Sequence, residues 1–159
     1  MLTDKQSAKL DVIRKFPNAL ETAVANLTEE QLDAFPIDDE WSVRQIVHHC
    51  ADSHMNSIVR LKLILTEDNP PLKPYAEALW AKTADVTDVP ISASLTLLKG
   101  LHQRWVVLFG SLTADQWQRT GFHSDLKKQL TPNDLLDIYE RHCTAHLEQI
   151  ERTIAALGE

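Results

Sequence analysis

The sequence has 159 residues, the length of one ordinary domain, and we expect a single domain over residues 1–159. Hydrophobic residues make up 43% and charged residues 25%, as in soluble globular proteins, which excludes wholesale disorder. The formal net charge is −7 and there is no basic tract, so we expect no nucleic-acid partner. The chain has no long apolar run, no signal-peptide pattern and only two cysteines. These features predict a cytoplasmic protein without a membrane partner.

Helix-forming residues dominate the sequence. It contains only four glycines and no glycine-rich nucleotide-binding motif. We find neither an alternating strand pattern nor a hairpin turn signal, so we predict an all-α fold.

The first half of the chain contains two long predicted helices. The first covers residues 4–25, with a break at Pro17, because proline cannot donate the helical hydrogen bond. Capping-box patterns at residues 28–31 and 42–45 then open a short helical turn and a second long helix, which runs to about Leu65.

Four prolines fall within residues 70–90, which predicts a long crossover connection with one helical stretch at residues 75–82. The remaining predicted elements are a third long helix over 92–109, a capped turn at 113–116, a polar loop over 118–130 and a last helix over 131–157. Four long helices and one long crossover predict a four-helix bundle.

The last predicted helix carries His142 and His146, four residues apart and therefore on one helix face, roughly 6 Å from each other. Both share a stripe with the apolar residues of this helix, so they point into the core. One interpretation is a pair of core histidines satisfied by hydrogen bonds. The other is a metal site, because one ion satisfies both imidazoles at once.

The second long helix offers His48, His49 and His54 as a third ligand. His49 lies at the edge of the apolar stripe, His54 near its middle as a core histidine, and His48 on the opposite, more exposed flank. We therefore favour His49 over His54, and both over His48. The polar row that continues from His49 along this edge is Ser53, Asn56 and Arg60.

Three histidines on two helices, with a fourth coordination position left open, are typical of a catalytic metal site. We expect one divalent metal ion per chain, bound by His49, His142 and His146. Ligation by nitrogen alone favours zinc or nickel and allows iron or copper. Candidate hydrogen-bond acceptors for the outer ring nitrogens are Asp52, Ser53 and Tyr139.

Residues 41–56 resemble the second-helix motif of the DinB-like superfamily, and of its YfiT-like branch in particular. In that motif a tryptophan is followed eight residues later by a metal-binding histidine, here His49. The Tyr-x-x-His-x-x-x-His element of the family's fourth helix matches Tyr139, His142 and His146. The resemblance implies a four-helix bundle, a three-histidine site that often holds nickel or zinc, and a homodimer. Members are described as metal-dependent hydrolases and as bacillithiol S-transferases.

The first functional hypothesis is a metal-dependent transferase. A metal-bound low-molecular-weight thiol loses its proton, and the thiolate attacks an electrophilic substrate. Arg60 and Asn56 are candidates to hold carboxylates or hydroxyls of the thiol, and Asp52 is a third candidate pocket residue.

Two alternatives remain open. A hydrolase would use a metal-bound water with a pKa near about 7 and a general base, for which Asp52, Glu67 and His123 are candidates. A non-catalytic metal-binding stress protein would close the site with a fourth protein ligand, from His123, His54 or Cys50.

Other notable residues have simpler interpretations. We expect His102 to be exposed or to cap a helix, and Cys50 and Cys143 to be inert, buried thiols. Tyr75 and Trp80, in the crossover, are expected either to cover the mouth of the site or to form a dimer contact.

Overall fold

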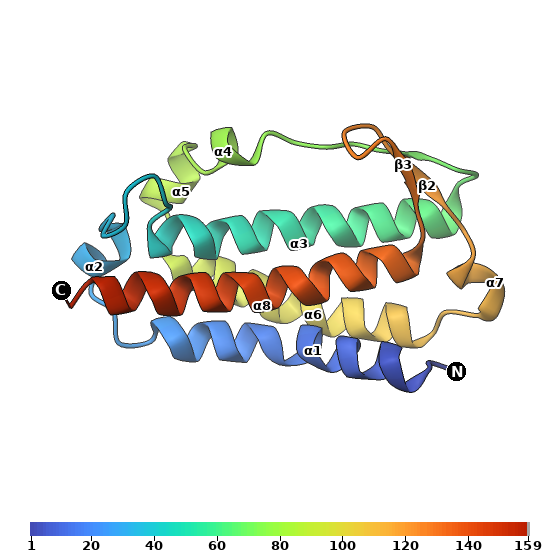
Figure 1. The fold of residues 1–159 in the computed structure, drawn as a ribbon, viewed down its shortest axis with the longest axis horizontal. Helices are drawn as coiled ribbons and strands as arrows, with labels where there is room; N and C mark the ends of the chain where they lie inside the picture. Colours follow the sequence, from blue (N-terminus) through green and yellow to red (C-terminus); the bar gives the residue numbers. More distant parts are fainter. Residues whose placement is uncertain (159) are drawn as a thin grey trace.

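A computed structural model describes residues 1–158 and confirms the predicted four-helix bundle (Figure 1). The long helices are α1 (Asp4–Val24), α3 (Val43–Thr66), α6 (Ile91–Gly110) and α8 (Pro132–Ala156). Helices α1 and α3 each pack against both α6 and α8, so the four buried faces meet along the centre of the bundle. Among residues 1–158, no helix combines the length and the apolar character needed to span a membrane.

The direction of the helices follows from the crossover between α3 and α6. In Figure 1 this segment returns along the outside of the bundle, so that α6 runs in the same direction as α3, whereas α1 and α8 run the opposite way. The crossover contains two short helices, α4 (Glu77–Trp80) and α5 (Ala84–Asp88). The predicted helical stretch at residues 75–82 corresponds to α4, and the sequence did not predict α5.

Capping boxes open three of the four long helices, α1, α3 and α8. Two further short helices, α2 (Glu29–Asp33) and α7 (Ala114–Trp117), begin in this way. In each box a threonine or serine accepts a hydrogen bond from the backbone three residues later, which contributes about 1 kcal/mol to helix stability. The capping residues are Thr3, Thr28, Ser42, Thr113 and Thr131.

The predicted break in the first helix is wrong, because α1 continues through Pro17. Proline at this position leaves the carbonyl of Ile13 without its helical donor. That carbonyl instead lies 2.6 Å from Nδ1 of His102, which donates to it. Helix α1 also buries Phe16 and Leu20 on either side of the proline, and this packing offsets the lost helical bond.

His48 lies in the interface between α3 and the crossover, and the prediction that it lies on an exposed flank is wrong. Its side chain is only 6% exposed. The ring donates from Nε2 to the carbonyl of Val89, at 3.1 Å, and accepts at Nδ1 from the hydroxyl of Ser94, at 2.8 Å. Two partners from the crossover and α6 therefore satisfy both ring nitrogens, which leaves His48 unsuitable as a metal ligand.

The structure also contains a small sheet that the sequence did not predict. Its strands are β1 (Pro71–Leu72), β2 (Gly121–His123) and β3 (Lys128–Leu130), in the order β1-β2-β3. Strand β1 is parallel to β2, and β2 is antiparallel to β3. The predicted polar loop over 118–130 is thus partly a hairpin. Strands of two or three residues are too short to show the alternation that identifies a strand in a sequence.

Gly121 brings this sheet onto the end of α3. A Cβ atom at this position would lie 2.8 Å from Cδ2 of Leu72 and 3.0 Å from Cγ1 of Ile64. The close approach therefore requires glycine. It brings β2 against α3, while β3 contacts α8, and the side chains of His123 and Leu130 line a cavity there.

Candidate metal centre

Three histidines meet between α3 and α8. His49 comes from α3, while His142 and His146 lie one turn apart on α8, and one ring nitrogen from each lies within 4.8 Å of the others. The structure thus brings together the three residues that the sequence predicted as metal ligands. No fourth histidine, cysteine or carboxylate joins the cluster within residues 1–158.

The spacing inside the cluster fits a divalent ion. Nε2 of His49 faces Nε2 of His142 at 3.2 Å. A tetrahedral ion with metal–nitrogen bonds of 2.0–2.1 Å holds two nitrogen ligands about 3.3 Å apart. Two facing imidazole nitrogens can form a hydrogen bond only if one of them carries a proton, whereas an ion binds the lone pairs of both. The donor set therefore fits zinc, nickel or a related metal.

The cluster is neutral at neutral pH. Burial, with a smaller effect from nearby His146, lowers the pKa of His49 to about 4. Burial also lowers the pKa of His142 far below its ordinary value, and that of His146 in the same direction. These shifts keep the three rings uncharged at pH 7, which is the form in which an imidazole binds a metal ion.

A glutamine on α8 orients His146. The ring donates from Nδ1 to Oε1 of Gln149 at 2.8 Å, which leaves Nε2 as the nitrogen that faces the cluster. Nε2 of Gln149 in turn lies 3.5 Å from a carboxylate oxygen of Glu40, which also accepts from Arg152 at 2.9 Å. The amide is therefore held by a charged pair on the outer side of the site.

The outer acceptors predicted from the sequence do not serve this role. No hydrogen bond joins Asp52, Ser53 or Tyr139 to a ligand histidine in the described part of the chain. Instead, the hydroxyl of Tyr139 donates to the carbonyl of Ser53 at 3.0 Å. The phenol thus joins α8 to α3 beside the site and does not support a ligand.

The partner of His142 is another histidine. His54 is fully buried, as the sequence predicted for a core histidine, and its Nε2 lies 3.0 Å from Nδ1 of His142. Nδ1 of His54 lies 2.7 Å from Nε2 of His102. The prediction that His102 is exposed or capping is wrong: it is 2% exposed and lies between α6 and α1.

A cavity of about 580 Å³ extends from His142 along α3 and α8, within the size range of small-molecule sites. Arg60 lies in its wall and is only 9% exposed. Its Nη2 donates to the carbonyl of Lys73 at 2.6 Å, but its Nε has no hydrogen-bond partner in the described part of the chain. Among residues 1–158, no carboxylate lies within 4.0 Å of this guanidinium. Other residues that line the cavity include Trp41, Ser53, Tyr75, His123 and Tyr139.

Of the three pocket residues predicted from the sequence, the structure places only Arg60 in the cavity wall. Asn56 donates from its amide to the carbonyl of Asp52 at 2.9 Å, one turn back on the same helix. Asp52 is half-buried, and burial, together with nearby Asp85, raises its pKa to about 6. Neither Asp52 nor Asn56 lines the cavity.

Of the predicted general bases, one lines the cavity and the others lie elsewhere. His123, on β2, lines the cavity, whereas Glu67 lies at the end of α3 beside a different, shallow pocket. The sequence missed Glu77, which lines both the cavity and an opening of about 310 Å³ over the histidine cluster. Glu77 lies in the crossover, and nothing in the local pattern shows that this segment folds over the site.

The crossover contributes one aromatic side chain, that of Tyr75, to the wall of the cavity. Tyr75 lines the cavity, and its ring centroid lies 4.5 Å from that of Trp80. Of the two predicted roles for this pair, covering the site agrees with the position of Tyr75. Trp41 lines both openings and contacts His49 edge-on, at 4.8 Å between ring centroids.

The cluster has no fourth protein ligand within residues 1–158, as a catalytic metal site requires. His123, His54 and Cys50, the candidates to close the site, all lie outside it. Cys50 and Cys143 are fully buried, and burial raises the pKa of both thiols, which agrees with the prediction that they are inert.

A family model described as the DinB superfamily matches residues 13–150. The chain belongs to the DinB superfamily. This DinB superfamily member is 40% identical over 149 residues to a Bacillus subtilis protein named "Putative metal-dependent hydrolase YfiT", with 94% of this chain and 84% of that protein covered. It is 45% identical over 138 residues to a Geobacillus thermodenitrificans protein named "Putative metal-dependent hydrolase", covering 87% of this chain and 78% of the relative.

The solved structure of Bacillus subtilis YfiT has the same fold as this DinB superfamily chain. The TM-score is 0.93 at 38% sequence identity, over 99% of this chain and 91% of the other. That protein is described as "a probable metal-dependent hydrolase with an unusual four-helix bundle topology".

Proposed function

We propose that this protein is a divalent-metal-dependent transferase that joins a low-molecular-weight thiol carrying a carboxylate to an electrophilic substrate. The observation that carries this proposal is the buried Arg60, which has no carboxylate partner among residues 1–158 and lines the same cavity as His142. A buried and unpaired charge costs several kcal/mol, so an anionic group in the cavity would be bound favourably. A guanidinium binds a carboxylate through two parallel hydrogen bonds.

Each part of the site has a role in this proposal. His49, His142 and His146 would hold one zinc or nickel ion. When bound, such an ion would lower the pKa of a coordinated thiol and so favour the reactive thiolate at neutral pH. Arg60 binds the carboxylate of the thiol, and Trp41 keeps water away from the sulfur on the side of His49.

The transfer step is a substitution at carbon. The sulfur donates its electron pair to the electrophilic carbon, and the C–S bond forms while the bond from that carbon to the leaving group breaks. The leaving group departs with the bonding electron pair, and the proton of the thiol passes to solvent. The protein residues orient the two reactants, a contribution that depends on their being held close and aligned.

The test is an S-conjugation assay with zinc- or nickel-loaded protein, monochlorobimane as electrophile, and two thiols, mercaptosuccinate and 2-mercaptoethanol. We expect Arg60→Gln to raise KM at least about tenfold for mercaptosuccinate and to leave 2-mercaptoethanol unaffected, since a charge-assisted hydrogen bond is worth about 1.5–3 kcal/mol. Arg104→Gln, on the exposed face of α6, is the matched control and should change neither. No metal-dependent conjugation with either thiol would refute the transferase.

The second candidate function is hydrolysis, which the names of the two relatives and the positions of Glu77 and His123 favour. Here the metal would lower the pKa of water toward about 7, and one of these two side chains would accept its proton. Ester and amide substrates distinguish the two reactions. If Glu77→Gln abolishes hydrolysis and leaves conjugation intact, Glu77 is the general base. If the parent protein hydrolyses these substrates and conjugates neither thiol, the second function is favoured.

The homodimer and the cytoplasmic location remain predictions from the sequence. Size-exclusion chromatography with light scattering at several protein concentrations would test the dimer directly. A mass of 18.0 kDa at all concentrations would identify a monomer.

A further inference from the structure

Three histidine rings form a continuous row from α1 to the metal centre. The row begins at the carbonyl of Ile13, which lies 2.6 Å from Nδ1 of His102. Nε2 of His102 lies 2.7 Å from Nδ1 of His54, and Nε2 of His54 lies 3.0 Å from Nδ1 of His142. The row therefore ends on a ligand of the three-histidine cluster, while its first two members touch neither the metal position nor the cavity.

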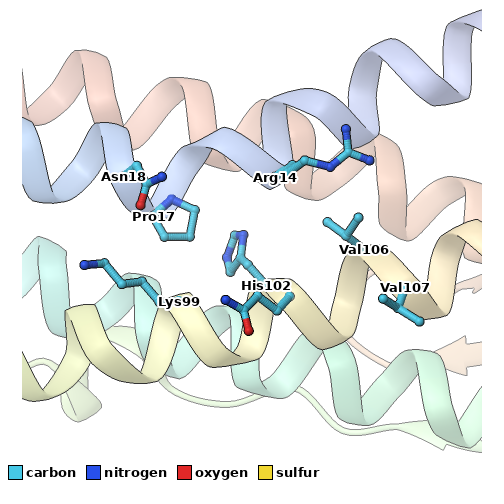
Figure 2. Close-up of a pocket in the computed structure, with 8 residues that line it drawn as sticks. Arg14, Pro17, Asn18, Lys99, His102, Val106 and Val107 are labelled. Atoms are coloured by element: carbon cyan, nitrogen blue, oxygen red, sulfur yellow. The ribbon is translucent and has the colours of Figure 1, made fainter.

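The end of the row at α1 has a fixed direction. A carbonyl oxygen can only accept a hydrogen bond, so the proton of this contact lies on Nδ1 of His102. The carbonyl of Ile13 is available because Pro17, four residues later, has no N–H to donate to it. Figure 2 shows the ring of His102 reaching from α6 toward α1, next to Pro17.

This fixed end determines which ring nitrogen carries the proton in each histidine of the row. Neutral His102, with its proton on Nδ1, has a lone pair on Nε2, so His54 must donate to it from Nδ1. Neutral His54 then has its own lone pair on Nε2, and His142 must donate to it from Nδ1. His142 is left with a lone pair on Nε2, the nitrogen that faces His49 in the cluster.

We propose that His102 and His54 are positioning residues that fix the metal-binding tautomer of His142, using the backbone carbonyl that Pro17 leaves free. The inference rests on the proposed metal site for its purpose, but the direction of the hydrogen bonds does not depend on metal. Outer partners of this kind hold the ring orientation and raise ligand affinity, typically by 10–100-fold.

The three candidate ligands then differ in which ring nitrogen carries the proton before a metal ion binds. Gln149 fixes His146 with its proton on Nδ1, and the histidine row fixes His142 in the same tautomer. The 3.2 Å contact between His49 and His142 requires a donor, and only Nε2 of His49 can supply the proton. His49 is therefore the one candidate ligand that would have to give up its proton on Nε2 in order to bind a metal ion.

The test combines a structural readout with metal affinity. Full-length protein labelled with ¹⁵N-histidine and treated with chelator is studied by long-range ¹H–¹⁵N correlation spectra, which identify the protonated nitrogen of each ring. We expect Nδ1–H on His102, His54 and His142, and Nε2–H on His49. Adding zinc should move the proton of His49 alone.

Two substitutions of His102 distinguish an effect of hydrogen-bond direction on His142 from an effect of side-chain packing. His102→Leu removes the acceptor that fixes His54, whereas the amide oxygen of His102→Gln can replace Nε2 as that acceptor. We expect His102→Leu to give mixed tautomers at His142 and zinc binding 10–100-fold weaker in competition with a chromophoric chelator. His102→Gln should keep Nδ1–H on His142 and zinc affinity within about threefold of the parent.

Several results would overturn the proposal. Nε2–H on His54 or His142 in the parent spectrum would do so without any variant, as would an unchanged tautomer of His142 in a folded His102→Leu protein. Equal loss of zinc affinity in both variants would indicate a packing effect only. A parent protein that shows the expected tautomers but binds no zinc or nickel would refute the proposed function and leave the histidine row standing.

Discussion

Acidification should lower the stability of the chelator-treated protein, in part because His102 is buried as a neutral ring. His102 does not contact any of the three candidate metal ligands directly. Burial lowers its folded-state pKa from 6.5 to about 4. The unfolded chain therefore binds more protons between these two values, and stability falls as pH drops through this window. Well above pH 6.5 both states are neutral at this site, and the contribution of His102 to pH dependence vanishes.

The two pKa values give the size of the effect. Between about pH 7.5 and about pH 5, protonation of the unfolded state at His102 removes about 2 kcal/mol from the free energy of unfolding. This is a large fraction of the 5–15 kcal/mol that stabilises a typical domain. His54, which is fully buried and whose pKa is also lowered, adds a loss in the same direction. Asp52, with a pKa raised to about 6, opposes it in part.

The assay is urea unfolding followed by circular dichroism at both pH values, for the parent and for His102→Gln. Glutamine does not titrate, so the variant should lose about 2 kcal/mol less than the parent between the two conditions. Comparing the two proteins cancels the contribution of Asp52, which both contain. A difference below about 0.5 kcal/mol, with unchanged urea dependence, would show that His102 is not buried as a neutral ring.

Three further predictions concern the site and its support. His142→Ala should abolish the stoichiometric zinc or nickel measured by elemental analysis, with affinity more than about 100-fold lower, and metal retained in this variant would rule out the cluster. Gln149→Leu should weaken zinc binding 10–100-fold in chelator competition, whereas the control Gln103→Leu, on the surface of α6, should not change it. Equal zinc affinities of the two variants would show that the Gln149 amide does not support His146. Gly121→Ala should lower the free energy of unfolding in urea by about 1–3 kcal/mol, because the added Cβ atom overlaps a neighbouring leucine. Gly100→Ala should raise it by up to about 1 kcal/mol, because this helical position has open space around it. The opposite order of stabilities would contradict the packing of β2.

Local sequence patterns were sufficient to predict the four long helices and the three histidines that the structure brings together as candidate metal ligands. Capping boxes and apolar stripes are local signals, since each depends on residues three or four positions apart. The pair His142 and His146 could be found for the same reason, and the position of His49 at the edge of its stripe separated it from His48 and His54.

The surroundings of these three histidines depend on the packing of distant segments and could not be predicted from local patterns. Pro17 is plain in the sequence, but its consequence depends on which side chain faces the carbonyl it leaves free, and α6 supplies His102 from 89 residues away. The short strands and the place of Glu77 over the cluster likewise follow from where the crossover lies. A single helix face shows which side chains are buried, but the hydrogen-bond partner of a buried polar group is set by the packing of other elements against it.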